Sequence, residues 1–596
     1  MGDKKIKIDE YKEIRLGGFQ ARSHNWWEEA NPEESEEEEQ QGQEWRYLEH
    51  HGVLFPPFYK RHNVGLIYDG QLIELTEEQE ELCTYWAQSI GSPYENKEIY
   101  RKNFESLMQT KFKGFQLEKA DFTRIKEYLE QQRLLRLNKS DEQKKQEKLE
   151  RDQRELFYGY ALVDGCLERV GNYTLEQPTL FKGRGEHPKA GLLKARIYPE
   201  ELTVNLSVQA PVPQCKLPGH SWGKIVHRND VTWLFSYVDS SIRKDNHKYV
   251  QFAATSRFKQ MNDKRKYEKA RRLKNSIDQI RENYTKKLQS DSIKERQLGT
   301  ATYLIDKLAL RVGNEKDEDE ADTVGCCSLR VEHIKLKDDD VVAFDFLGKD
   351  SMRYNNEVKL AHQIWKNLKL FIKGKQPEDN LFSDISVDDL NDYLKKQMEG
   401  LTAKVFRTYN ASFTLQQQLD LGGELDGHSI QQKVDFYDNA NKQVAILCNH
   451  QKTISKQFEL TKKKINTKLE CMKTYIQELE AHYKKKNPNE YEEEVQLEEG
   501  SQKKNNVYLK KFPGQHEKIK QLIQRTEEKY QKELKGLEKK EENKEIALGT
   551  SKTNYNDPRI SVAFCKVHDV PIERVFSKTL RNKFIWAMAT DSNWKF

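Results

Sequence analysis

Tyr555 lies in the stretch GTSKTNYNDPRISVAF (549–564), between two asparagines and just before a strand-like run. Asn, Asp and Pro favour turns, so this segment alone predicts an exposed turn residue. A tyrosine hydroxyl has an ordinary pKa of about 10. To act as a nucleophile it needs an activated target and a stabilised pentavalent centre. For a phosphodiester, this means guanidinium groups and a neutral donor on the non-bridging oxygens, and an acid for the departing alkoxide.

Four residues stand in settings that suit this chemistry: Arg311 in DKLALRVGNEK, Lys349 in the turn LGKDS, Arg407 in GLTAKVFRTYNAS and His450 in VAILCNHQ. Each also has a plainer role. Arg311 could pair with a carboxylate, Lys349 could lie on a solvated turn, and His450 could be a hydrogen-bonded core histidine. Because the chain holds 101 Lys and Arg, composition does not select among these roles.

The composition predicts a multidomain chain with long solvated helices. Of the 596 residues, 33% are charged and 36% hydrophobic, against about 25% charged in an average globular protein. The length corresponds to about four domains, and the 10% of aromatic residues predicts real cores. No run of about 18 apolar residues predicts a membrane span, and the N-terminus carries no apolar signal segment.

The eight cysteines form no CxxC pair. This argues against a zinc or disulfide framework and favours a reducing, intracellular compartment. Cys326 and Cys327 are adjacent in an apolar context, so we expect both to serve packing.

Charge is unevenly distributed along the chain. Residues 33–44 are acidic, and we expect residues 1–43 to form a disordered extension. Residues 257–296 contain 14 Lys and Arg against 6 Asp and Glu. Leu273, Ile277, Ile280, Tyr284 and Leu288 recur there at helical spacing, which predicts a helix with an apolar inner stripe and a basic outer face. Together with the basic segment 182–197, this helix suggests a surface for a polyanion.

The secondary-structure elements that must position the candidate residues are predicted in consecutive blocks along the chain. We expect small strands and turns over 45–69, mostly helix over 70–155 with a long charged helix at 139–155, and strands over 156–256, including 231–238. Residues 258–453 are predicted to be helical with one hairpin. In that hairpin Val342, Phe344 and Phe346 alternate before the turn 348–350, and residues 351–354 return.

Residues 454–544 carry heptads. Phe458, Ile465, Met472 and Leu479 are seven apart, and Lys462, Leu469, Ile476 and Tyr483 each follow four later. The pattern breaks around Pro488, Gly500 and Pro513 and resumes with Ile523, Tyr530, Leu534 and Leu537. Two heptad arms with a turn between them predict an antiparallel helical hairpin.

The ordered motifs resemble those of eukaryotic (type IB) DNA topoisomerase I from about residue 45 to Phe596. They are KNFE (102–105), LFKGRGEHPKAG (180–191), YEKARRLKN (267–275), LIDKLALRVGNEK (304–316), ADTVGCCSLRVEHI (321–334), FDFLGKDS (344–351), GLTAKVFRTYNAS (400–412), AILCNHQ (445–451) and IALGTSKTNYNDPRI (546–560). The resemblance implies an enzyme that relaxes positive and negative supercoils, without ATP or an obligatory metal.

The resemblance also implies the role of each site residue. Tyr555 is then the nucleophile that leaves a 3′-phosphotyrosyl link and a free 5′-hydroxyl. Arg311 and Arg407 match the transition-state arginines, His450 the donor to a non-bridging oxygen, and Lys349 the general acid for the 5′-oxygen. The expected DNA-binding or cleavage-site shell comprises Arg196, Asp350, Asn554 and Lys404. No cofactor and no metal is expected.

The implied fold is α+β and multidomain, a bilobed clamp around duplex DNA. Its expected parts are an acidic extension (1–43), a mixed α/β cap lobe (44–257), a mainly helical catalytic core related to tyrosine recombinases (258–453), a coiled-coil linker (454–544) and a small helical C-terminal domain (545–596). The expected partner is supercoiled double-stranded DNA, with little sequence specificity and no membrane. We expect a monomer in the nucleus.

Two alternatives share part of the pattern. A tyrosine recombinase uses the same Arg, Lys, Arg, His and Tyr set. Recombinases generally place a histidine three residues before the second arginine, where this chain has Lys404, and they have little use for a 90-residue helical hairpin before the tyrosine. A non-enzymatic basic coiled-coil protein would explain the charge and the heptads but not the ordered motifs.

Overall fold

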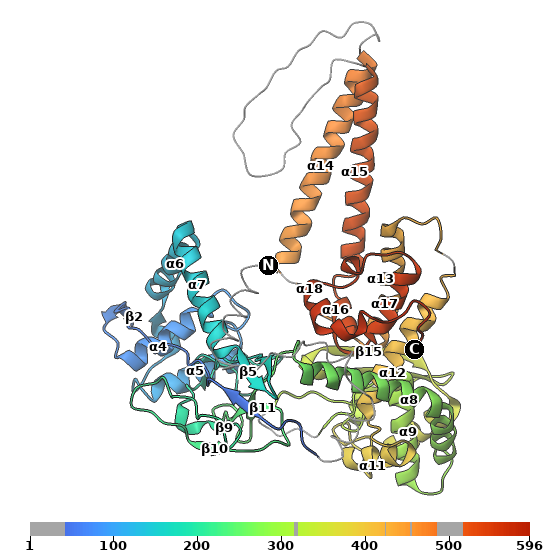
Figure 1. Cartoon of the computed structure of the whole chain (residues 1–596), viewed down its shortest axis with the longest axis horizontal. Coiled ribbons are helices and arrows are strands. Elements are labelled where there is room, and N and C mark those ends of the chain that lie inside the picture. The colour runs from blue at the N-terminus through green and yellow to red at the C-terminus, as the bar shows by residue number, and fades with distance from the viewer. Residues whose placement is uncertain (1–41, 315–319, 424, 453, 455, 486–515) are drawn as a thin grey trace. The chain divides into compact units, whose positions relative to one another are not determined.

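The computed structural model describes residues 42–314, 320–423, 425–452, 454, 456–485 and 516–596 (Figure 1). Most of the predicted N-terminal extension and the predicted turn of the heptad block (487–515) lie outside these residues. Two compact units are formed. The first comprises the chain up to Asn410 together with Asp557–Phe596, and the second comprises Ala411–Asn556.

The helices of the first unit include those up to the first part of α12 and the last two α-helices of the chain. They are α4 (Glu77–Ala87), α5 (Glu98–Gln109), α6 (Thr123–Leu137), α7 (Asp141–Tyr158), α8 (Arg257–Lys287), α9 (Ile293–Leu308), α10 (His362–Ile372), α11 (Val387–Gln397), the first part of α12 (Ala403–Asp420), α17 (Pro558–Val567) and α18 (Lys578–Lys583). The predicted charged helix at 139–155 is therefore confirmed as α7. Its N-cap Ser140 forms a capping box with Gln143.

Five small sheets accompany these helices. Their strand orders are β1–β5–β6 (Leu48–His50, Tyr160–Val163, Cys166–Arg169), β3–β2–β4 (Gln71–Ile73, Leu66–Tyr68, Ala120–Asp121), β7–β8 (Thr179–Leu180, Leu193–Lys194), β10–β9–β11–β12 (Lys224–Val226, Thr203–Asn205, Trp233–Val238, His247–Gln251) and β13–β14–β15 (Ile334–Leu336, Val341–Leu347, Arg353–Lys359). The strands predicted over 156–256 are confirmed. Only the β10–β9 pair is parallel among the named strands of these sheets.

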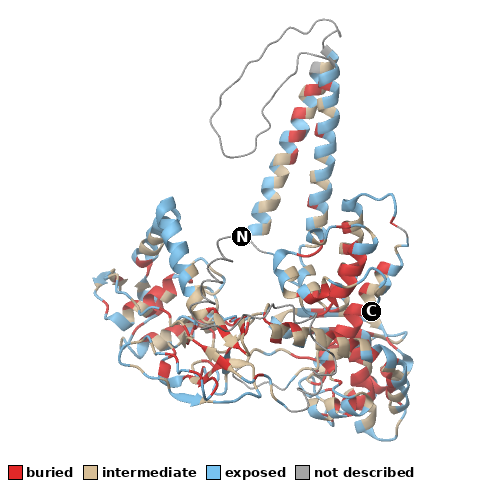
Figure 2. Cartoon of the chain, in the orientation of Figure 1, coloured by how far each residue is buried: buried red, intermediate tan, exposed pale blue. Residues whose placement is uncertain are grey.

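Residues 45–258 bury two separate hydrophobic cores. One lies among the sheets of β1–β5–β6 and β9–β12 and includes Trp45, Phe235 and Phe258. The other packs α4 and α5 against β2, where the rings of Trp86 and Phe104 stack with centroids 4.5 Å apart. Figure 2 shows buried residues concentrated inside these layers while α6 and α7 remain largely exposed.

The long helix α8 confirms the stripe predicted from sequence. Leu273, Ile277, Ile280, Tyr284 and Leu288 are all buried. Arg281 of α8 forms a bidentate pair with the buried Asp306 of α9, at 3.0 and 3.2 Å, and Tyr284 donates to the same carboxylate. These contacts hold α8 against α9, whose end leads directly to Arg311.

The predicted hairpin is confirmed as β14 and β15, which pair in seven consecutive positions. A third strand, β13, was not predicted. It is only three residues long, too short for an alternation pattern to reveal.

The second unit contains the rest of α12, α13 (Ile430–Leu447), α14 (Lys456–Lys485), α15 (His516–Glu542) and α16 (Leu548–Asn554). The arms α14 and α15 lie side by side (Figure 1). Lys462 pairs with Glu541 and Lys468 with Glu533, so the arms run in opposite directions. The arms have many exposed positions, but the side chains of Met472, Leu479 and Ile519 are fully buried. The predicted antiparallel helical hairpin is thus confirmed for the described arms.

One local prediction was wrong. The run after Tyr555 is the helix α17, not a strand. Asp557 is its N-cap and accepts from the Arg559 amide, and Pro558 occupies the first helical position. Both are ordinary signals of a helix start, and they outweigh the β-branched residues that suggested a strand.

Among the residues that the structure covers, we find no helix with both the length and the apolar character needed to cross a bilayer.

Candidate active site

Arg407 lies on α12 and is only 5% exposed. Its guanidinium donates to the carbonyl of Ala309, which ends α9 in a left-handed conformation with φ of 49°. Three residues along the same face, Asn410 donates to the Asp306 carbonyl at 2.6 Å. The motifs around Arg407 and Arg311 therefore meet, because α12 contacts the carbonyls that immediately precede Arg311.

The half-buried Arg311 lies in a segment that packs tightly on residues 325–327. Its carbonyl accepts from the Cys326 amide at 2.7 Å, and the Val312 carbonyl accepts from the Cys327 amide at 2.7 Å. Gly313 has φ of 78°, and a Cβ on Gly325 would lie 2.4 Å from the Gly313 Cα. The two backbones can approach this closely only because both positions are glycine.

The two adjacent cysteines of this contact are buried, which confirms their predicted packing role. Desolvation raises the pKa of the Cys327 thiol to about 12 and also raises that of Cys326. Both therefore remain neutral, apolar-like groups beneath the Arg311 segment.

Lys349 is exposed at the tip of the β14–β15 hairpin. Asp350 and Ser351 follow in left-handed conformations, with φ of 67° and 57°, and the Gly348 amide donates to the Met352 carbonyl at 2.8 Å. Lower in the hairpin, the Val324 amide donates to the Leu347 carbonyl at 2.8 Å. The hairpin is thus bonded to the segment that holds Arg311 in place.

Asp350 forms an ion pair with Arg184, a residue that the sequence analysis did not select. Arg184 lies in the basic segment 182–197, which was noted only for its charge. The selected residue, Arg196, is held at a different place. Its guanidinium donates to the Pro56 and Pro57 carbonyls at 2.8 and 2.6 Å and lies 4.5 Å from the centre of the Phe58 ring.

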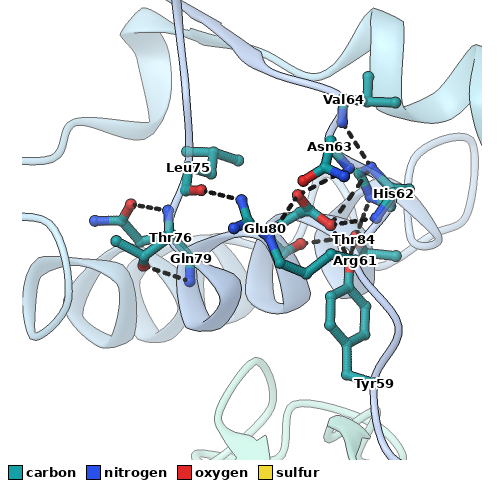
Figure 3. Close-up of polar contacts among 10 residues, drawn as sticks. All are labelled: Tyr59, Arg61, His62, Asn63, Val64, Leu75, Thr76, Gln79, Glu80 and Thr84. Atoms are coloured by element: carbon teal, nitrogen blue, oxygen red, sulfur yellow. Dashed lines mark hydrogen bonds and ion pairs between the residues drawn. The ribbon is translucent and has the colours of Figure 1, made fainter.

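The loop that holds Arg196 is itself organised by a buried carboxylate (Figure 3). Glu80 of α4 is 1% exposed and accepts from the Tyr59 hydroxyl at 3.0 Å and from the His62 and Asn63 amides at 2.7 and 3.1 Å. Thr84, one turn later on α4, contacts both Tyr59 and His62. The Pro56 and Pro57 carbonyls are therefore part of a well-anchored loop.

Lys404 is exposed on the first turn of α12. It lies close enough to Lys266 of α8 to influence that side chain. Burial lowers the pKa of Lys266, and the positive charges of Lys583 and Lys404 lower it further, while Asp263 opposes the shift. Asp263 forms ion pairs with Lys266 and Lys583 at 2.9 and 3.4 Å, so it partly neutralises this group of lysines.

In the second unit, the structure brings together His450 and Tyr555, which are far apart in the sequence. Their rings stack with centroids 5.0 Å apart and planes inclined by 27°. Both residues are buried, with 5% and 7% exposed. The prediction of an exposed turn residue at Tyr555 was therefore wrong, because contacts with distant residues cover it.

Sequence analysis missed the polar residues around this pair. The fully buried Ser551 lies on α16, and its Oγ is 2.8 Å from His450 Nδ1. The Ser551 carbonyl accepts from the amides of Tyr555 and Asn556, both at 2.9 Å, and Ser412 Oγ donates to the Tyr555 carbonyl at 3.1 Å. The only sequence signal was the position of Ser551, four residues before the tyrosine.

Two asparagines flank the tyrosine differently. Asn554 is exposed and donates to the Thr550 carbonyl at 3.3 Å. Asn556 is buried and donates to Asn441 of α13 at 2.9 Å, while Asn441 donates to the Leu548 carbonyl at 3.1 Å. Asn556 is thus anchored in the interior, whereas Asn554 faces solvent.

The base of the α14–α15 pair closes beside His450. The Ala547 amide donates to the His450 carbonyl at 2.7 Å and the Lys452 amide to the Glu545 carbonyl at 2.8 Å, and Gln451 and Ile546 form an antiparallel bridge. The chain therefore leaves and re-enters this region at one place.

Comparison with known families gives three consecutive matches. Residues 43–252 match the family described as eukaryotic DNA topoisomerase I, DNA binding fragment, and residues 255–483 match eukaryotic DNA topoisomerase I, catalytic core. Residues 527–596 match the C-terminal topoisomerase domain.

Curated relatives match along nearly the whole chain. DNA topoisomerase 1 of Homo sapiens is 43% identical over 586 residues, covering 96% of this chain and 73% of that protein. DNA topoisomerase 1 beta of Arabidopsis thaliana is 43% identical over 556 residues, covering 93% of this chain. DNA topoisomerase 1 of Caenorhabditis elegans is 43% identical over 585 residues. The chain spans 59% of the length of the Arabidopsis relative and 68% of the Caenorhabditis one.

Proposed function

The chain belongs to the eukaryotic DNA topoisomerase I family, and on that premise we propose that it is a type IB topoisomerase. Such an enzyme relaxes positive and negative supercoils by cutting one strand, allowing rotation and resealing the strand. It needs neither ATP nor an obligatory metal, because the phosphodiester energy is kept in a phosphotyrosyl ester.

The observation that carries this proposal is the buried pair of His450 and Tyr555. The two rings stack with centroids 5.0 Å apart, which places the proposed nucleophile next to a side chain that can donate a hydrogen bond. Arg407, buried on α12, and Arg311, two residues after the carbonyl that Arg407 contacts, supply permanently charged groups suited to a phosphate.

The proposed cleavage step has five participants besides the DNA. The Tyr555 oxygen attacks phosphorus and forms the P–O bond as the bond to the 5′-oxygen breaks. The phenolic proton passes to solvent, and Lys349 gives a proton to the departing 5′-oxygen. Arg311, Arg407 and His450 stabilise the charge on the non-bridging oxygens. Resealing is the reverse, with the 5′-hydroxyl attacking the 3′-phosphotyrosine.

The exposed position of Lys349 on a rigid hairpin supports its role, since a groove of DNA can be reached from such a tip. Arg196, Asp350, Asn554 and Lys404 are proposed for the shell around the cleaved phosphate. Arg184 joins them through its ion pair with Asp350.

The proposed organisation is a bilobed clamp. Its parts are an N-terminal extension (1–43), a cap lobe (44–257), a catalytic core related to tyrosine recombinases (258–453), a coiled-coil linker (454–544) and a C-terminal domain with the nucleophile (545–596). The antiparallel pairing of α14 and α15 supports the linker assignment. The acting form is proposed to be a nuclear monomer.

The proposed substrate is supercoiled double-stranded DNA, bound with little sequence preference. The exposed position of Lys404 supports recognition of phosphates, which carries no sequence information and weakens steeply with salt.

A nicked suicide duplex tests the proposal directly. Cleavage near the nick releases a short fragment that carries the free 5′-hydroxyl, so resealing is prevented and the covalent complex accumulates. Mapping of the DNA-linked peptide should identify Tyr555 joined to a 3′-phosphate. A link through another residue, or to a 5′-phosphate, would refute the assignment.

A further inference from the structure

Ser551 contacts both members of the buried pair. Its Oγ lies 2.8 Å from His450 Nδ1, and its carbonyl accepts from the Tyr555 amide at 2.9 Å. Ser551 is fully buried, so these contacts do not compete with water. One residue of α16 therefore sets the histidine ring and the tyrosine backbone relative to each other.

The histidine ring has little freedom at this place. The His450 amide donates to the Ala445 carbonyl at 2.8 Å, and the His450 carbonyl accepts from Ala547 at 2.7 Å. The ring also stacks on Tyr555. Because the backbone is held on both sides, Nδ1 stays directed at Ser551.

A serine hydroxyl can donate to Nδ1 or accept from it, and the two choices give opposite tautomers. Across the described residues, the Ser551 hydroxyl has His450 Nδ1 as its one hydrogen-bond partner. If the hydroxyl donates, its proton is accepted by Nδ1, and the ring proton on Nε2 is available for the phosphate oxygen that His450 is proposed to contact. If the hydroxyl instead accepts, its own proton has no acceptor among the described residues even when the phosphate is bound. With the hydroxyl as donor, the proton of the neutral ring resides on Nε2.

We propose that Ser551 is a positioning residue whose hydroxyl donates to His450 Nδ1 and thereby holds the proton on Nε2. This rests on the proposed function, in which His450 must donate to a non-bridging phosphate oxygen. With the proton on Nδ1, the neutral ring would present a lone pair to the phosphate and repel it. Ser551 acts on the reaction only through His450 and touches no reacting atom.

The first test reads the tautomer without DNA. The full chain is labelled with ¹⁵N-histidine, and the His450 signals are identified by their loss in His450→Gln. We expect the neutral ring to carry its proton on Nε2 and the Ser551→Ala variant to shift toward a mixture of tautomers. A proton on Nδ1 in the unsubstituted chain overturns the proposal. This measurement decides the matter even where Ser551→Ala does not fold.

The second test is a double-mutant cycle on the suicide duplex. Removal of one transition-state donor typically slows an enzyme by about 10²–10³-fold, which sets the loss expected for His450→Ala. Ser551→Ala should slow cleavage by less, on the order of tenfold, and should cause no further loss in the His450→Ala background. An equal loss in both backgrounds would mean that Ser551 acts independently of His450 and would overturn the proposal.

Thr553→Ala is the matched control. Thr553 lies on the same helix, and its hydroxyl donates to the Gly549 carbonyl at 2.8 Å. Its removal should leave both the tautomer and the cleavage rate unchanged. If the proposed function is wrong, the unsubstituted chain should form no covalent complex with the DNA. The tautomer is measured without DNA, so it does not depend on that outcome.

Discussion

Substitution of Gly325 by alanine should displace Arg311 without unfolding the protein. An alanine Cβ at this position would lie 2.4 Å from the Gly313 Cα and 2.8 Å from the Arg311 carbonyl oxygen, whereas ordinary contact begins near 3.4 Å. The obstructing atoms are backbone atoms, so no side chain can rotate away. The two segments must separate by about 1 Å, the difference between 3.4 and 2.4 Å.

This displacement gives the expected magnitude. Overpacking of this kind costs about 1–3 kcal/mol of folding free energy, which a chain of this size tolerates. The loss of cleavage rate should be more pronounced than the loss of stability, because a misplacement of about 1 Å can slow a reaction about 10²-fold. We therefore expect Gly325→Ala to cleave the suicide duplex about 10²-fold more slowly while it binds intact duplex normally.

The assay combines single-turnover cleavage, DNA binding and thermal unfolding. Gly536→Ala on α15 is the control, since a Cβ there meets nothing within 4 Å. In an exposed helix this change should stabilise by about 0.5–1 kcal/mol and leave cleavage unchanged. Cleavage by Gly325→Ala at the unsubstituted rate would refute the reasoning. Loss of cleavage together with global unfolding would show that the contact matters for folding rather than for placing Arg311.

Four further outcomes are expected. Tyr555→Phe should bind DNA normally but relax none, and plasmid relaxation above background by this variant would disprove the nucleophile. Lys349→Ala should cleave normal DNA very slowly but recover on a 5′-bridging phosphorothiolate, whose sulfur leaves without protonation; equal impairment on both substrates would give Lys349 a binding role. Relaxation of both signs of supercoil should proceed without ATP and in EDTA, and an absolute requirement for ATP or magnesium would count against the proposed chemistry. Replacement of residues 454–544 by a short loop should preserve cleavage and speed DNA rotation in single-molecule traces. Residues 456–486 of the first arm contain 9 Lys and Arg against 4 Asp and Glu, and this positive charge would no longer attract the rotating duplex. Unchanged rotation would leave the pair as a spacer.

Periodic patterns predicted much of the fold. The stripe of α8, the alternation of β14 and the heptads of α14 and α15 each repeat over several turns or pairs, so one mismatch does not hide them. Short or terminal features were missed. The strand β13 has three residues, and α17 was mistaken for a strand although Asp557 and Pro558 marked a helix start.

Local sequence patterns predicted the contacts of the candidate site less well than they predicted the fold. The burial of Tyr555 depends on His450 and Ser412, which are distant in sequence, so its polar neighbours suggested the opposite. Arg184 and Arg196 lie in the same basic segment. The structure distinguishes them because Arg184 pairs with Asp350, whereas Arg196 donates to the Pro56 carbonyl. Charge and spacing give no information about which arginine meets a carboxylate from another element.

The closure at the base of α14 and α15 bears on how this chain can change in length over evolution. The Gln451–Ile546 bridge and the Lys452–Glu545 bond join the two ends before the arms begin. Removing seven residues from each arm would shorten the pair by about 10 Å and keep its facing surfaces. Removing seven from the first arm alone, between the base and Lys462, would slide Lys462 and Lys468 away from Glu541 and Glu533. Insertions and deletions here should therefore persist in descendants mainly as matched pairs of whole heptads, one on each arm.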